Sequence, residues 1–253
     1  MRPVVIPMLA TAVVVLAMVT PQAPQRRPAR KPVTRVVHIA GYRSGESLSL
    51  GGLVAGSDVI LIGTAVAVVR EDPVPVNATD PDCNLYVTCY LVEVERYLEW
   101  EGAPNQPPTI KVLVSGGAGS DGVMRVFERE PRLAVGGRYL LFLNSGRAIK
   151  LGPHGEAIAF CCGAEGINVY PDEYLPSSPL RGIVQIQDGV TTLPQDPYQP
   201  DLPPWVFLDD LAEDGTPVVS TLLGLPENEA IQLVEQAIAE WAAHLREVEE
   251  SMN

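Results

Sequence analysis

Short segments rich in β-branched residues recur along this chain, and they constrain its fold more than any other feature. The ranges 58–69, 88–98, 109–114, 123–127 and 138–143 combine β-branched and aromatic residues, several of them alternating with polar ones, which is typical of strands. Further strands are predicted at 35–40, 157–162, 167–170 and 182–187, and only a weak helical turn at 47–55. Regular spacing without long intervening helices predicts a mainly β fold, an antiparallel barrel or sandwich.

The C-terminal part of the chain has a different pattern and predicts a helix over residues 226–250. Pro226 suits a first-turn position, and Glu227 and Glu229 suit the positive end of a helix dipole. Apolar residues then recur at three- and four-residue steps: Ile231, Val234, Ile238, Trp241, Leu245 and Val248. We expect this stripe to pack on the barrel of the same chain, with a coiled-coil dimer as the alternative.

The N-terminal residues 1–20 consist of one positive charge followed by an apolar run, which is the layout of a secretory signal. Small residues up to Ala17 suit cleavage there, and a retained membrane anchor is the alternative. Residues 21–45 then form a basic, proline-rich linker, residues 46–193 the β domain, and residues 194–225 a proline-rich arm before the helix. This organisation predicts a protein that is secreted or exposed at the cell surface.

The charge of the chain is strongly uneven, with a formal net charge of −13. Seven basic residues and no acidic residue lie before position 46, whereas all 31 acidic residues follow. Such a domain repels phosphate backbones, so we expect no nucleic-acid partner. The expected partner is a protein or another envelope component, and residues 1–20 are a possible membrane tether.

An even number of cysteines in an exported chain predicts disulfides. A four-thiolate metal site is the alternative, but adjacent cysteines on a strand point to opposite faces, which makes four convergent ligands hard to build. A bond between the adjacent cysteines would close a strained small ring. We therefore expect each early cysteine to bond to one member of the late pair, and both such pairings stay open for Cys83, Cys89, Cys161 and Cys162.

Sequence motifs assign no catalytic, cofactor-binding or metal-binding residue. The range 117–122 matches a dinucleotide fingerprint, but a predicted strand follows it instead of a helix, which indicates a hairpin loop. The range 80–84 has the acidic spacing that opens a calcium loop, but Leu85 and Leu91 stand where the loop needs glycine and glutamate. No serine lies in a nucleophile elbow. The histidines form no ligand pattern, since they lie far apart at His38, His154 and His244.

The central stretch, about residues 46 to 170, resembles exported bacterial domains of unknown function that are similar to small OB-type barrels. The most specific segments are SDVILIGTAV at 57–66 and VGGRYLLFL at 135–143. The resemblance implies a small antiparallel OB-like barrel, distantly similar to netrin and tissue-inhibitor-of-metalloproteinase modules. Those inhibitors engage a catalytic metal through an N-terminal cysteine, and this chain has no cysteine before Cys83.

These features together predict a binding or interaction module of the cell envelope or extracellular space, and not an enzyme. A secreted hydrolase with an active site assembled from distant loops is the alternative. A module similar to a protease inhibitor is a third possibility.

Overall fold

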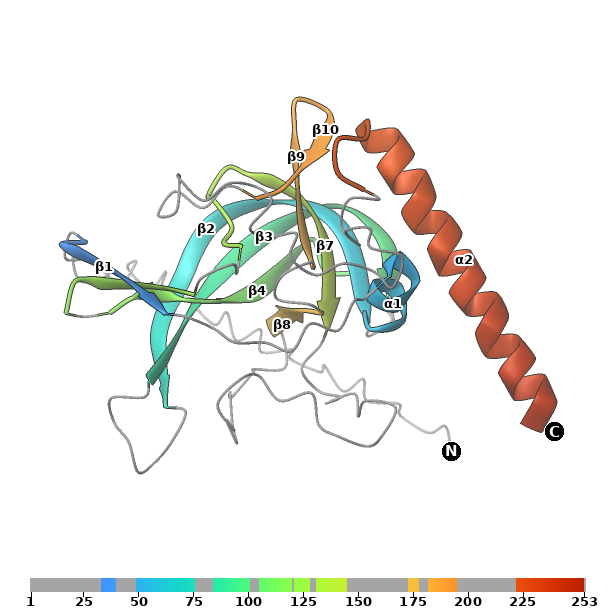
Figure 1. Ribbon diagram of the computed structural model, residues 1–253, viewed down its shortest axis with the longest axis horizontal. Coiled ribbons are helices and arrows are strands. Elements are labelled where there is room, and N and C mark those ends of the chain that lie inside the picture. Colours follow the sequence, from blue (N-terminus) through green and yellow to red (C-terminus); the bar gives the residue numbers. More distant parts are fainter. Residues whose placement is uncertain are drawn as a thin grey trace, which may run out of the picture. The chain divides into compact units, whose positions relative to one another are not determined.

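The computed structural model describes residues 33–39, 49–75, 84–100, 105–119, 121–127, 131–144, 173–177, 182–194 and 222–252, which all lie in one unit, residues 31–253. Strands dominate, and one long helix ends the described chain (Figure 1). The predicted mainly β fold with a C-terminal helix is therefore confirmed. In chain order the elements are β1 (Arg35–Ile39), α1 (Leu50–Ala55), β2 (Val59–Pro75), β3 (Asn84–Trp100), β4 (Thr109–Ser115), β5 (Gly117–Ala118), β6 (Val123–Phe127), β7 (Arg138–Asn144), β8 (Glu173–Pro176), β9 (Ile183–Gln187), β10 (Val190–Thr192) and α2 (Glu227–Met252).

Five of the described strands close into a small barrel. Around the barrel they follow the order β7, β2, β3, β4 and β8, and β8 pairs again with β7. Every seam is antiparallel except β4–β8, where Lys111 lies opposite Glu173 in a parallel pair. Because the last strand lies between the third and the fourth, the arrangement is compatible with an OB-like barrel. The predicted antiparallel barrel thus contains one parallel seam.

The two longest strands, β2 and β3, have 17 residues each and pair along their length. Their register shifts at four places, and each such irregularity bends a strand and increases its twist. Figure 1 shows the resulting curvature of β2. Gly63 lies at one of these shifts, and a Cβ atom there would lie 2.6 Å from the carbonyl oxygen of Glu93. The bend therefore requires a residue without a side chain at this position.

Apolar side chains fill the inside of the barrel and also cover part of its outside. Leu61 and Leu141 belong to the interior cluster, whereas Ile60 and Phe142, their neighbours in sequence, belong to a second cluster beneath α1 and α2. β2 and β7 are thus buried on both faces in this region. This explains why the ranges 58–69 and 138–143 are too apolar for strands with one solvated face.

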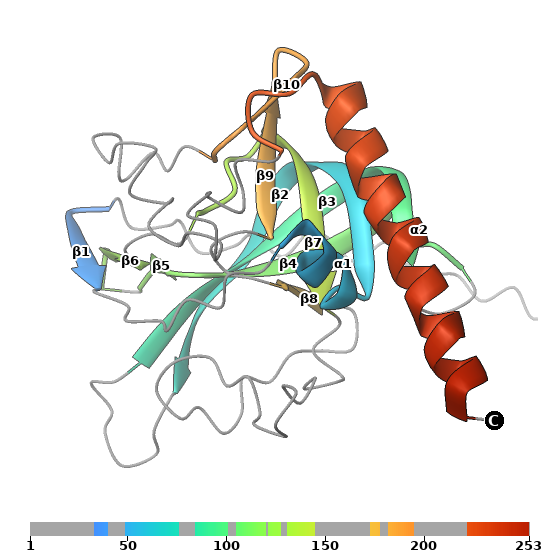
Figure 2. The same cartoon turned by 45° about the vertical axis from the view of Figure 1, so that its right-hand side comes forward.

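Helix α2 packs through its N-terminal half on this second cluster, which we name the outer cluster. Ala230, Val234 and Ala237 are buried there, and Trp241 is the last helix residue that packs against the cluster. Figure 2 shows α2 beside α1, and the helix also contacts β3 and β10. The prediction that the stripe docks on the same chain holds as far as Trp241, whereas Leu245 is 41% exposed. No helix within the described ranges is long and apolar enough to span a bilayer.

A separate sheet contains β1, β6 and β5 in that order, with β1 parallel to β6. β5 and β6 form an antiparallel hairpin, so residues 117–122 lead from strand to strand and the hairpin interpretation is confirmed. The weak helical turn is α1, whose first turn is capped by the Ser49 side chain, which accepts from the Gly52 N–H at 3.1 Å. The strands predicted at 157–162 and 167–170 lie outside the described residues.

Candidate functional site

The most unusual polar feature of the described barrel is a pair of charged neighbours, Arg70 and Glu71, near the end of β2. Arg70 lies opposite Cys89 of β3, and Glu71 lies opposite Thr88. Because successive residues of a strand face opposite sides of a sheet, Arg70 points to the outer side of the barrel and Glu71 to the inner side. Each of the two charges has a partner of opposite sign.

On the outer side, the guanidinium of Arg70 donates two hydrogen bonds to the carboxylate of Glu173, one from Nη1 and one from Nη2 at 3.0 Å. Glu173 is only 1% exposed, and its place on β8 is set by the parallel seam with β4. The thiol of Cys89 lies 3.9 Å from Glu173 Oε1. The Glu173 carboxylate is thus buried, whereas the Arg70 side chain is 26% exposed, and Cys89 belongs to a small apolar cluster. The other members of this cluster are Val69, Val87, Leu113 and Leu175.

On the inner side, Arg132 lies buried with 3% exposure at the end of the interior core. Its Nη2 donates to Thr88 Oγ1 at 2.9 Å and approaches Glu71 Oε1 at 3.8 Å. Thr88 Oγ1 in turn donates to the carbonyl oxygen of Gly116 at 2.7 Å, just before β5. A buried arginine must have its hydrogen-bonding groups satisfied, and these contacts connect β2, β3 and the approach to β5.

The two ion pairs connect segments that are distant in sequence, and we name them the outer pair (Arg70–Glu173) and the inner pair (Arg132–Glu71). In both pairs a positive charge is matched by a negative one within the protein. Within the described ranges, no three His, Cys, Asp or Glu side chains come together as they would around a metal ion. The absence of catalytic and cofactor-binding residues stays a prediction.

Of the predicted disulfide residues, the structure describes only Cys89, which is buried on β3. Cys83, Cys161 and Cys162 lie outside the described residues, so no disulfide falls within them and the pairing stays a prediction. Strand β8 begins at Glu173, shortly after Cys162 in the sequence, and Glu173 lies beside Cys89. Of the histidines, His154 lies outside the described residues, and the exposed His244 lies 5.6 Å from Trp241 between ring centres.

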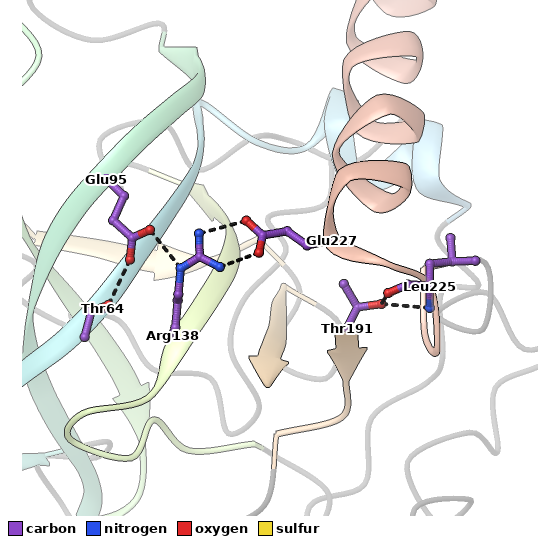
Figure 3. A network of polar contacts seen from close by, with 6 residues as sticks. All are labelled: Thr64, Glu95, Arg138, Thr191, Leu225 and Glu227. Atoms are coloured by element: carbon purple, nitrogen blue, oxygen red, sulfur yellow. Dashed lines mark hydrogen bonds and ion pairs between the residues drawn. The ribbon is translucent and has the colours of Figure 1, made fainter. Parts of the chain in front are cut away.

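A second polar network fixes the start of α2 on the barrel (Figure 3). Arg138 of β7 donates to both carboxylate oxygens of Glu227 at 2.6 and 2.8 Å, and its Nε donates to Glu95 of β3 at 2.8 Å. These carboxylates raise the pKa of Arg138, and Arg138 lowers the pKa of Glu227 below its ordinary value. Nearby, the buried Thr191 accepts from the Leu225 N–H at 3.2 Å and donates to the Leu222 carbonyl. The helix therefore begins at a defined point.

Sequence reasoning missed both ion pairs. A signal for them exists, because three charged residues, Arg70, Glu71 and Asp72, follow the apolar part of the strand, and buried charges are usually paired. The partners were not predictable, since Glu173 lies 103 positions from Arg70. Comparison with known proteins adds no functional assignment, because no family model and no curated protein matches this chain.

Proposed function

We propose that this protein is an exported binding module, in which an OB-type barrel holds a protein or another envelope component outside the cytoplasm. The observation that carries the proposal is the barrel closure, in which the parallel β4–β8 seam gives an OB-like strand order. Barrels of this type bind ligands on the face of their second and third strands and on the two adjoining loops. Here those strands are β3 and β4, and the segments at the positions of these loops are residues 76–83 and 145–172, which lie outside the described residues.

The outer and inner pairs support this choice of face. Both lie toward the end of β2 and the start of β3, between which residues 76–83 lie in the sequence, and Glu173 begins the strand that follows residues 145–172. Binding sites need a rigid frame beneath variable loops, and a buried ion pair on each side of β2 supplies one. The net charge of −13 favours a basic partner surface.

The proposal includes the finer points of the sequence-based prediction. Residues 1–20 act as a signal peptide or as a membrane tether, the four cysteines form disulfides, and the protein is secreted or exposed at the cell surface. We also propose that the protein has a bacterial source and that its barrel is distantly similar to netrin-like and inhibitor-like modules. Inhibition through an N-terminal cysteine is not part of the proposal, because Cys83 is the first cysteine of the chain.

Site-specific photo-crosslinking in the producing cell tests this proposal. Glu93 and Thr109 lie opposite each other on β3 and β4, and both are exposed. A photoreactive residue at either position should capture the same envelope or extracellular component, identified by mass spectrometry. The matched control is Gln232, an exposed position on α2. Capture of the same species from all three positions, or of nothing from positions 93 and 109, would overturn the proposal.

A further inference from the structure

Helix α2 continues well past the surface on which it docks. It has 26 residues, which corresponds to a length of about 39 Å at 1.5 Å per residue. Ala230 and Val234 are buried, but every residue described from His244 to Ser251 is exposed. Figures 1 and 2 show this C-terminal part running on past α1. About the last two turns of the helix are therefore in contact with solvent.

The apolar stripe of the helix does not stop where docking stops. Leu245 and Val248 follow Trp241 at steps of four and three residues, so they lie on the same helix face as the docked Val234. Their side chains are 41% and 38% exposed, among the most exposed large apolar residues that the structure describes. A solvated helix end needs no apolar residues at these positions. Leu245 and Val248, which we name the exposed stripe, are thus continuous with an interface that is already packed as far as Trp241.

The charges around the exposed stripe indicate which partner fits. The last turns carry Glu240, Glu247, Glu249 and Glu250 against Arg246, and the final turn contains no basic residue. The C-terminal end of a helix already carries a negative partial charge, so these carboxylates add to it. Cationic groups brought there by a partner are therefore stabilising. A second copy of α2 would instead bring the same carboxylates together.

We infer that the exposed stripe of α2 docks an amphipathic helix of another protein, with an apolar face flanked by lysine or arginine. Such a helix extends the outer cluster beyond Trp241 by packing on Leu245 and Val248. Its basic flanks lie beside the glutamates of α2, as in helix pairs whose charges select the partner. This inference goes beyond the proposed function, since that concerns the face of β3 and β4.

The experiment uses the full chain and two synthetic peptides of about three heptads, both with leucine at positions a and d. One peptide carries lysine at positions e and g, and the other carries glutamate. Binding is measured by fluorescence anisotropy of the labelled peptides. The test variant is Leu245→Ser with Val248→Ser. The control variant is Val135→Ser with Val190→Ser, which replaces two exposed valines elsewhere on the protein.

The lysine peptide should bind the wild type and the control variant equally, and the test variant about tenfold more weakly. The glutamate peptide should bind the wild type at least about tenfold more weakly than the lysine peptide. Equal binding of the lysine peptide to the test variant would show attraction by charge alone and overturn the inference. A wild-type dimer in sedimentation that becomes a monomer in the test variant would assign the stripe to a second copy, which also overturns it.

Discussion

Replacing Val234 by alanine tests how α2 is held on the barrel. Val234 is 0% exposed in the outer cluster. The two carbon atoms lost account for about 1.6 kcal/mol of burial, and the cavity left behind adds about 1 kcal/mol. The higher helix propensity of alanine offsets about 0.5 kcal/mol. We therefore expect Val234→Ala to lower the free energy of unfolding by about 2 kcal/mol.

Replacing an apolar residue by alanine farther along the helix should lower the free energy of unfolding much less. Leu245 lies beyond the docked part and is 41% exposed, so Leu245→Ala should cost less than about 0.5 kcal/mol. Trp241 is half-buried, and Trp241→Ala should fall between the two, at about 1.5 kcal/mol. The control is Gln232→Ala, at an exposed position on the opposite side of the helix. Urea unfolding with a constant m-value gives each difference. Equal losses at Val234 and Leu245 would refute the conclusion that docking ends at Trp241.

Three further predictions concern the ion pairs and the cysteines. Glu227→Gln should cost about 1 kcal/mol at neutral pH, since the pair with Arg138 is bidentate but partly exposed. Because the pKa of Glu227 is lowered from 4.5, this contribution is present above that value and is lost as the pH falls through the lowered pKa. The urea midpoints of wild type and variant should thus converge in acid, and a constant difference would contradict the assignment. Arg70→Leu should cost about 3 kcal/mol, because it removes the guanidinium from a buried carboxylate, and adding Glu173→Leu should restore most of the loss in urea unfolding. A double variant as unstable as the single one would show that the pair does not act as a unit. Non-reducing peptide mapping of the exported protein should find two disulfides, each between one of Cys83 and Cys89 and one of Cys161 and Cys162. Each bond closes a loop of about seventy residues, which stabilises the fold by about 4 kcal/mol. A bond within the late pair, or four free thiols, would contradict this prediction.

The strands with the strongest local pattern were predictable from the sequence. The ranges 123–127 and 138–143 correspond to β6 and β7 almost residue for residue. Five consecutive residues of β7 are buried, because one face of the strand contacts the interior core and the other face contacts the outer cluster. Burial of this kind leaves a continuous apolar run in the sequence, so local reasoning is sufficient to find the strand.

Three strands, β5, β8 and β10, escaped prediction, and for the last two the reasons differ. β8 has only four residues, contains a glutamate and ends in Pro176, and its conformation depends on pairing with β4 and β7. Such long-range pairing leaves no periodic pattern. β10 did have a signal, because the Asp188–Gly189 dipeptide is typical of a tight hairpin turn. Both residues adopt positive φ, 52° and 75°, as that turn requires.

The full length of β2 was not predictable either. The predicted range ended at 69, where charged residues begin, whereas β2 continues to Pro75. Pairing with β3 and the two ion pairs stabilise a strand in which polar residues would otherwise be unfavourable. The candidate site depends on these same contacts between segments distant in sequence. For that reason the sequence indicated an exported barrel but not the frame beneath its proposed binding face.

The opposite charges of Arg70 and Glu71 also bear on how the barrel finds its correct strand alignment. β2 and β3 pair with several irregularities, and an apolar strand buried on both faces does little to distinguish neighbouring alignments. A slip of one residue in one direction would turn Glu71 toward the carboxylate of Glu173, and a slip in the other direction would turn Arg70 toward the guanidinium of Arg132. Either slip therefore brings two groups of like charge together and removes an ion pair, which is unfavourable where the groups are buried. The two neighbouring residues therefore favour one alignment of β2 in the closed barrel over its neighbours.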